Sequence, residues 1–182
     1  MSARSTALLL AVAVCSAFGI RDAKTALKHG QAQQERRVTA KEKNVKALLE
    51  IFSLIERRDP QHPNTQRALE LFEPDVEFHW PDSLPYGGTT RGSNIKEPTW
   101  GATWNPLQPT ETERKMDPRV VAASDDEVVV LWQQRGISPA GERFDGEVLG
   151  LYRLRDGKLA RAQMFYFDTE AVARFLARAK NQ

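Results

Sequence analysis

Apolar and polar residues alternate most regularly near the C-terminus of the chain. Two such runs, residues 144–154 and 159–167, flank a short polar segment that contains Asp156 and Gly157. Asp-Gly between alternating runs is typical of a two-residue turn, because both central positions of that turn need a positive φ. The pattern therefore predicts a long β-hairpin, and a long hairpin twists and curls as it extends.

A short amphipathic helix is predicted directly after this hairpin, over residues 170–179. Asp168 or Thr169 is placed to cap its first turn, since short polar side chains accept hydrogen bonds from free backbone N–H groups there. A curled hairpin that is closed by a terminal helix favours a cone-shaped sheet around a pocket.

Helical spacing dominates the first part of the domain, before the strands. A helix is predicted from residue 39 to the Asp59-Pro60 pair, and a second one over residues 65–72, where Glu73-Pro74 would end it. The apolar face of the first helix is formed by Val45, Leu48, Leu49, Phe52 and Ile55. A half-buried strand follows, in which Val76, Phe78 and Trp80 alternate with Glu77 and His79.

Residues 81–110 are irregular, aromatic and rich in Gly and Pro, and we expect a functional rim or lid there. A helix is expected in part of residues 94–104. Strands are predicted near residues 112–123, with a break at Asp117-Pro118, and over residues 127–136.

Composition narrows the class of protein. The chain has 182 residues and is 41% hydrophobic, which suits one domain with an extension. The net charge of +2 comes from a basic excess before residue 44, so no clustered basic face predicts nucleic-acid binding. The single cysteine, Cys15, excludes an internal disulfide, and the three scattered histidines predict no metal site.

The N-terminal region has the pattern of a targeting segment. Residues 1–20 combine a basic start, an uncharged apolar core and small residues, as in a signal peptide, although a buried N-terminal helix is the alternative. Residues 21–40 are predicted to be a basic disordered linker. We expect a secreted or periplasmic protein without a stable membrane span after signal removal; the alternative is an algal plastid, reached through a two-part signal that Ser16-Ala17-Phe18 resembles.

The order of the predicted elements, together with several short motifs, resembles a known family. These motifs are Phe72-Glu73-Pro74-Asp75-Val76-Glu77-Phe78, Tyr86-Gly87-Gly88-Thr89-Thr90-Arg91-Gly92, Arg155-Asp156-Gly157-Lys158-Leu159 and Tyr166-Phe167-Asp168-Thr169. They are similar to the SnoaL-like branch of the nuclear-transport-factor-2-like, ketosteroid-isomerase-like superfamily. The resemblance covers residues 44–180, within a domain placed at residues 41–182.

This resemblance implies an α+β fold in which three helices pack on a cone-shaped, strongly curved mixed β-sheet and enclose a pocket. It also implies a homodimer through the outer face of the sheet. That agrees with the strand at residues 127–136, whose two faces are both apolar. The superfamily includes polyketide cyclases, steroid isomerases, dehydratases and simple binding proteins, so the fold by itself does not choose among them.

Proton transfer next to a carbonyl group requires a base in a dry pocket. The polyketide cyclases carry an acid in the last strand, but counting seven residues from Gly157 reaches Met164. Glu147 is the best substitute, with a solvated outer-face residue or a partner for Arg161 as its alternatives. His79 is a second candidate, at the pocket mouth or as a satisfied surface or core histidine. Asp82 is a third, although it also fits an ordinary turn.

Large aromatic residues are expected to line the pocket and to offer hydroxyl donors, if they are not simply core. The candidates for substrate binding are Tyr86, Trp100, Trp104 and Tyr166. The prediction is a protein that holds a small hydrophobic molecule, as a cofactor-free isomerase, cyclase or dehydratase. The alternatives are a non-catalytic carrier or sensor, and a dimerisation module with a filled pocket.

Overall fold

The computed structural model describes residues 39–57, 67, 69–92 and 101–180, and residues Ala40–Gln182 form one compact unit. The predicted signal peptide, nearly all of the linker and Trp100 lie outside the described residues. None of the helices in the described ranges is long and apolar enough to cross a membrane.

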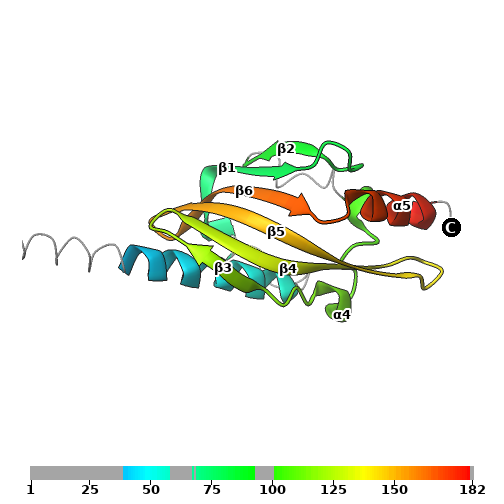
Figure 1. Ribbon diagram of the computed structural model, residues 1–182, viewed down its shortest axis with the longest axis horizontal. Helices are drawn as coiled ribbons and strands as arrows, with labels where there is room; N and C mark the ends of the chain where they lie inside the picture. Colours follow the sequence, from blue (N-terminus) through cyan, green and yellow to red (C-terminus); the bar gives the residue numbers. More distant parts are fainter. Residues whose placement is uncertain (1–38, 58–66, 68, 93–100, 181–182) are drawn as a thin grey trace, which may run out of the picture. The chain divides into compact units, whose positions relative to one another are not determined.

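A six-stranded mixed sheet in the order β2-β1-β6-β5-β4-β3 forms the centre of the unit (Figure 1). Its strands are β1 Phe72–Trp80, β2 Gly88–Arg91, β3 Arg119–Ala123, β4 Glu127–Ile137, β5 Arg143–Arg155 and β6 Lys158–Tyr166. β1 and β6 run parallel, whereas every other neighbouring pair is antiparallel. The α+β class and the curled mixed sheet that were predicted are confirmed.

The β5–β6 hairpin has the turn that the sequence predicts. Asp156 and Gly157 have φ values of 52° and 79°, the positive values that a two-residue turn needs. The register differs from the predicted pairing of Glu147 with Arg161, because Arg161 lies opposite Arg153 and Glu147 lies opposite Gln133 of β4. This register excludes Arg161 as the cross-strand partner of Glu147, which was one of the alternatives for that residue.

A helix over residues 39–56 packs its apolar side against the sheet and buries Leu48, Ile51 and Phe52. Asn44, which is 3% exposed, fixes its position at the end of the sheet. Its amide group donates to the carbonyl of Asp125 (2.7 Å) and accepts from the N–H of Gly157 (3.1 Å). One side chain thus joins the helix to the β3–β4 turn and to the β5–β6 turn.

The terminal helix α5, Thr169–Lys180, packs at the other end of the hairpin. Its buried residues are Val172, Phe175, Leu176 and Ala179. Asp168 caps it, since its Oδ1 accepts a hydrogen bond from the N–H of Ala171 at 2.8 Å. The predicted helix and its cap are confirmed.

Two predicted boundaries are wrong. Residues 111–114 form a short helix, α4 Glu111–Arg114, where a strand was predicted. The pattern Thr110-x-x-Glu113 is a helix-start signal, and the Thr110 hydroxyl donates to the Glu113 carboxylate. The strand β1 begins at Phe72, because Leu71 and Phe72 already pair with Leu159. Only α3, Gly101–Trp104, is described of the helix expected in residues 94–104.

Glu113 links stability to pH. Its side chain is 3% exposed and lies 2.6 Å from the guanidinium of Arg143. The hydrogen bond from Thr110, assisted by Arg143, holds the pKa of this carboxyl below its usual value of 4.5 although burial opposes the shift. A lowered carboxyl pKa stabilises the fold above the unfolded-state pKa, and this contribution is lost as the pH falls through the folded-state pKa.

We therefore expect Glu113→Gln to lower the free energy of unfolding at pH 7 by about 1–3 kcal/mol, the range for a hydrogen bond to a charged group. The same variant should lose less stability than the wild type when the pH falls below about 4.5. Urea unfolding between pH 3 and pH 7 measures both effects. Glu111→Gln, at an exposed position of the same helix, is the control. Parallel pH profiles for the wild type and Glu113→Gln would contradict this account.

Candidate functional site

The inner face of the sheet, which packs against the helices, carries two hydrophobic clusters. The first cluster unites the helix at residues 39–56 with the central strands, and it includes Phe52, Trp80, Trp132, Val148, Tyr152 and Met164. The second lies under α5 and contains Leu84, Leu107, Val172, Phe175 and Leu176. Tyr86 and Tyr166 pack against both clusters, and they therefore mark the boundary between them.

The two tyrosines are joined by a hydrogen bond at this boundary. The hydroxyl of Tyr86 donates to the hydroxyl oxygen of Tyr166 at 3.0 Å, although the residues are 80 positions apart in the sequence. The indole of Trp80 lies beside Tyr166 and opposes the rise of its pKa, and an indole N–H is only a donor. Because the proton of Tyr86 is used in this hydrogen bond, the proton of Tyr166 is the one that can be given to a third group.

Both phenols stay neutral. Burial raises the pKa of Tyr86, and the hydrogen bond to Tyr166 offsets part of that rise. Burial also raises the pKa of Tyr166, the neighbouring Tyr86 raises it further, and the nearby indole of Trp80 opposes the shift. Protonated phenols are hydrogen-bond donors, so the pair can serve an acceptor such as a carbonyl oxygen.

Indole rings surround this pair. The ring of Trp104 lies edge-on to Tyr86, with a centroid distance of 4.7 Å, and Trp80 lies 6.4 Å from each of these two rings. The structure thus brings together the predicted residues Tyr86, Trp104 and Tyr166. The alternation along β1 predicts that Trp80 is buried. It does not distinguish a core residue from one that lies beside a site.

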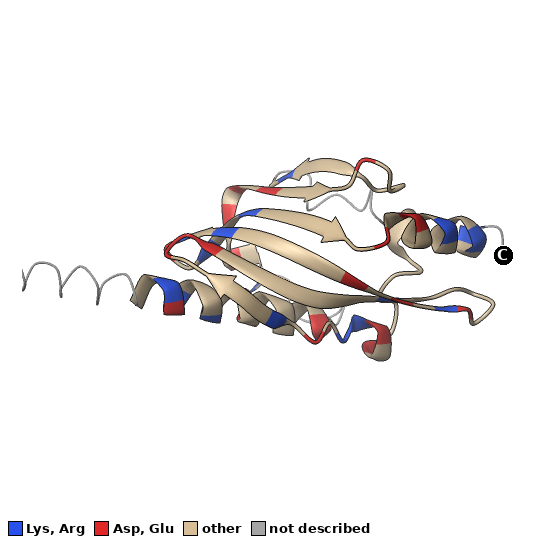
Figure 2. Ribbon diagram, in the orientation of Figure 1, with Lys and Arg blue, Asp and Glu red and all other residues tan. Residues whose placement is uncertain are grey.

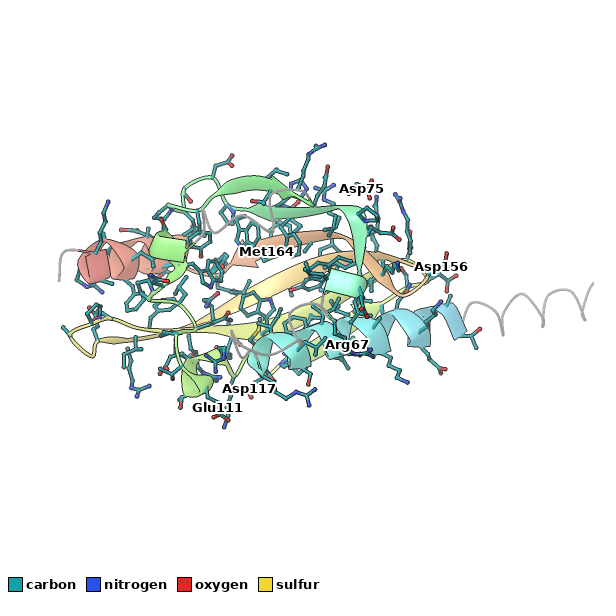
Figure 3. All side chains as sticks on the ribbon, turned by 180° about the vertical axis from the view of Figure 1, so that it is seen from behind. Arg67, Asp75, Glu111, Asp117, Asp156 and Met164 are labelled. Atoms are coloured by element: carbon teal, nitrogen blue, oxygen red, sulfur yellow. The ribbon has the colours of Figure 1, made fainter. Side chains whose placement is uncertain are left out.

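Met164 occupies the last-strand position at which the polyketide cyclases carry an acid. It is 5% exposed, lies opposite Gly150, and stands among the side chains that cover the inner face (Figure 3). Among the described residues, the only buried carboxylate is that of Glu113, which is paired with Arg143. In the part of the chain that the structure describes, the inner face therefore offers donors to a ligand but no buried carboxylate base beside the tyrosines.

Glu147 and Asp82 are both exposed in the structure, unlike the half-buried tyrosines of the pair. Glu147 is exposed on the outer face of β5, where the Gln133 amide donates to it at 3.5 Å. Asp82 is exposed in a turn that is closed by a hydrogen bond from Leu84 N–H to the carbonyl of Pro81. Glu147 is therefore a solvated residue of the outer face, and Asp82 is an ordinary turn residue. The sequence left both of these alternatives open.

His79 also lies on the outer face of the sheet. Its Nε2 is 3.0 Å from the carboxylate of Glu77, and its Nδ1 is 3.0 Å from the hydroxyl of Thr89. A second oxygen of Glu77 pairs with Arg91 at 2.8 Å. This polar network satisfies both ring nitrogens and places His79 across the sheet from the tyrosines.

Sequence reasoning missed three polar residues of the inner face, Tyr152, Trp132 and Gln134. The outer end of the Tyr152 ring lies over Gly150, where a Cβ atom would come within 2.3 Å of it. Burial raises the pKa of the Tyr152 hydroxyl, and the neighbouring indole of Trp132 opposes the shift. Trp132 and Gln134 alternate along β4 toward the interior and are 5% and 0% exposed. The alternation of residues along β4 predicts that Trp132 and Gln134 point to the interior, but it does not predict which polar contacts they make.

This architecture identifies the chain as a nuclear-transport-factor-2-like α+β protein. The chain belongs to the SnoaL-like domain family, whose model matches residues 45–162. No curated protein matches the sequence. No group of three or more potential metal ligands occurs among the residues that the structure describes.

Solved structures with the same fold are distant in sequence. Bal32a, from a soil-derived mobile gene cassette, is 16% identical, with a TM-score of 0.58 over 75% of this chain and 98% of Bal32a. TerC, co-crystallised with polyporic acid, is 23% identical, with a TM-score of 0.55 and coverage of 74% and 98%. A putative polyketide cyclase from Xanthomonas campestris pv. campestris is 13% identical, with a TM-score of 0.56 and coverage of 77% and 98%. These likenesses establish the fold.

Proposed function

We propose that this protein binds a small hydrophobic carbonyl compound between its two inner-face clusters and does not transform it. The observation that carries the proposal is the half-buried Tyr86–Tyr166 hydrogen bond at the boundary of the clusters, with the Tyr166 proton left to donate. A carbonyl oxygen is the acceptor that such a donor fits, and the surrounding indoles suit a flat apolar body.

The relatives of known structure support a ligand of this kind. TerC was co-crystallised with polyporic acid, and a further structural neighbour is a putative polyketide cyclase. Met164, in place of an acid, removes the base that proton abstraction would need at that point. This favours a carrier or sensor over an enzyme.

A bicyclic ketone, 1-tetralone, and its carbonyl-free analogue tetralin test the proposal. Tyr166→Phe removes the donor but keeps the ring, so it should weaken 1-tetralone binding about tenfold while tetralin binds as before. Tyr86→Phe should have a smaller effect in the same direction, because it removes only the hydrogen bond from Tyr86 to Tyr166 and leaves the Tyr166 hydroxyl in place. Titrations that follow tryptophan fluorescence measure both affinities.

Two outcomes would count against this function. Equal losses for 1-tetralone and tetralin in Tyr166→Phe would show that packing changed and that no carbonyl contact was removed. The absence of binding of either compound to the wild-type protein would leave the tyrosine pair as a purely structural contact.

The second candidate function is cofactor-free proton transfer next to the carbonyl group. A neutral Tyr166 donor would stabilise an enolate as it stabilises a carbonyl, and this favours the candidate. Exchange of the C2 hydrogens of 1-tetralone in heavy water separates the two functions. A rate equal to that in buffer supports the binding protein, whereas a faster rate that Tyr166→Phe abolishes supports the enzyme.

We also propose that two copies of the chain associate through the outer face of the sheet. An apolar stripe crosses β4, β5 and the end of β6 on that face, and its members are Val129, Leu131, Leu149, Leu151, Phe165 and Phe167. Figure 2 shows the central parts of these strands without charged residues, which gather nearer the strand ends. At one border of the stripe, Arg153 pairs with Glu127 of the same chain at 2.9 Å, so these two charges are compensated before a second copy approaches.

A further inference from the structure

Three polar side chains meet on the outer face of the sheet, which the proposed ligand site does not use. They lie where β1 pairs with the edge strand β2 (Figure 1), and the register places His79 opposite Thr89. Residues two positions apart on a strand share a face, so Glu77 projects to the same side as His79. The two strands thus bring a hydroxyl, an imidazole and a carboxylate side by side.

Two hydrogen bonds define the state of the imidazole ring. Nε2 of His79 is 3.0 Å from Oε2 of Glu77, and Nδ1 is 3.0 Å from the hydroxyl oxygen of Thr89. A carboxylate only accepts hydrogen bonds, so Nε2 carries the proton of the neutral ring and donates to Glu77. Nδ1 is then the acceptor, and the hydroxyl of Thr89 donates to it.

Glu77 stays ionised in this network. The hydrogen bond from His79 holds the pKa of the Glu77 carboxyl below its usual value of 4.5, the charges of Arg91 and Arg161 lower it further, and loss of solvent opposes the shift. Oε1 of Glu77 pairs with Arg91 at 2.8 Å, which leaves Oε2 for the imidazole. An anion on Nε2–H orients the ring and stabilises the imidazolium that forms when Nδ1 takes a proton.

The three side chains differ in their access to solvent. Thr89 is exposed, whereas the side chains of His79 and Glu77 are 20% and 28% exposed. A solute can therefore reach the hydroxyl while the base behind it is partly sheltered. Gln163 of β6 lies opposite His79, and Leu151 of the apolar stripe lies beyond Gln163 on β5. The network therefore stands at the β2 edge of the sheet, beside the stripe.

We infer that Thr89 is an acyl-accepting nucleophile, with His79 as its general base and Glu77 as a positioning residue. The substrate class is a small carboxylic ester with a good leaving group. The Thr89 oxygen bonds to the acyl carbon and the ester C–O bond breaks, while the hydroxyl proton passes to Nδ1 of His79 and then to the leaving oxygen. Water hydrolyses the acyl-threonine by the same proton route, so ester and water give acid and alcohol.

The activated ester p-nitrophenyl acetate tests this inference on the full chain. Peptide mapping by mass spectrometry after an acid quench should locate an acetyl group on Thr89, and its accumulation with time gives the rate. Thr89→Val keeps the shape of the side chain and removes the hydroxyl, so acetylation of this peptide should vanish. His79→Gln should slow the acetylation of Thr89 at least about 100-fold, the contribution of a positioned general base.

Glu77→Leu should slow the same reaction at least about tenfold, the loss expected with a hydrogen bond to a charged group. Glu77→Gln keeps an oxygen acceptor for Nε2–H and should recover part of the rate, which a merely structural role would not require. Thr90→Val is the matched control, because Thr90 is the neighbouring threonine of β2 and lies opposite Phe78. It should leave the acetylation of Thr89 unchanged.

Two results would overturn the inference. One is a wild-type map in which acetyl groups occur only on lysines and the N-terminus, and this result does not depend on the folding of any variant. The other is acetylation of Thr89 at the wild-type rate in His79→Gln, which would make Thr89 an ordinary exposed hydroxyl. Either result would leave the proposed ligand site at the tyrosine pair unchanged, because the two sites share no residue.

Discussion

Gly150→Ala is expected to destabilise the fold strongly. A Cβ at this position would lie 2.3 Å from Cε2 of Tyr152 and 2.4 Å from its hydroxyl oxygen. The ring cannot move aside easily, because Phe52 packs edge-on against it with a centroid distance of 5.8 Å. Overpacking a core costs about 1–3 kcal/mol, and we expect the upper end here because a whole ring is in the way. Urea unfolding monitored by tryptophan fluorescence gives the value.

A double-mutant cycle separates this collision from a general effect of glycine replacement. Tyr152→Leu removes the ring, so Gly150→Ala should cost about 1 kcal/mol or less in that background, and the two substitutions should couple strongly. Gly146→Ala is a milder comparison, since the nearest atom there is Cζ of Phe144 at 2.8 Å. An unfolding free energy for Gly150→Ala within about 0.5 kcal/mol of wild type would refute the argument.

Replacement of both Phe165 and Phe167 by Asp is expected to convert a dimer into a monomer. These side chains are 48% and 67% exposed in the single chain, which is unusual for phenylalanine. Phe165 lies beside Leu149 in the middle of the apolar stripe, so a second copy would bury it against apolar neighbours. Aromatic residues at the centre of an interface dominate its affinity, and the dissociation constant should rise at least about 100-fold.

Sedimentation velocity over a range of concentrations measures this change. Val121→Asp is the control, because Val121 is also an exposed apolar residue (52%) but belongs to the edge strand β3 beside a register shift. It should leave most of the dimer intact. A wild-type chain that sediments as a monomer at all concentrations would disprove the proposed association, and circular dichroism of the double variant shows whether the fold persists.

The sequence was sufficient for the elements whose signals are local. Asp156-Gly157 and Asp168 define their turn and cap by backbone chemistry alone, and the structure confirms both. The helix α4 was missed because Thr112 and its neighbours alternate like a strand, whereas the deciding signal was the helix-start pattern at Thr110. Short elements are set by such single contacts more than by periodicity.

The face of Glu147 could not be read from the sequence. β5 carries apolar residues on both faces, with Val148 inside and Leu149 outside, so alternation does not say which face is buried. The tyrosine pair was beyond prediction for a different reason, since Tyr86 and Tyr166 meet only after distant segments have packed together. The sequence identified these tyrosines as candidates, and the packing decides that they act together.

The position of β6 has a consequence for how the chain is made. β6 follows every other strand in the sequence, yet it lies between β1 and β5 and is the only link between the two halves of the described sheet (Figure 1). While the ribosome is still adding residues before Lys158, β1 and β2 have no partner in the rest of the described sheet. The domain therefore cannot complete its fold during translation until this strand has left the exit tunnel.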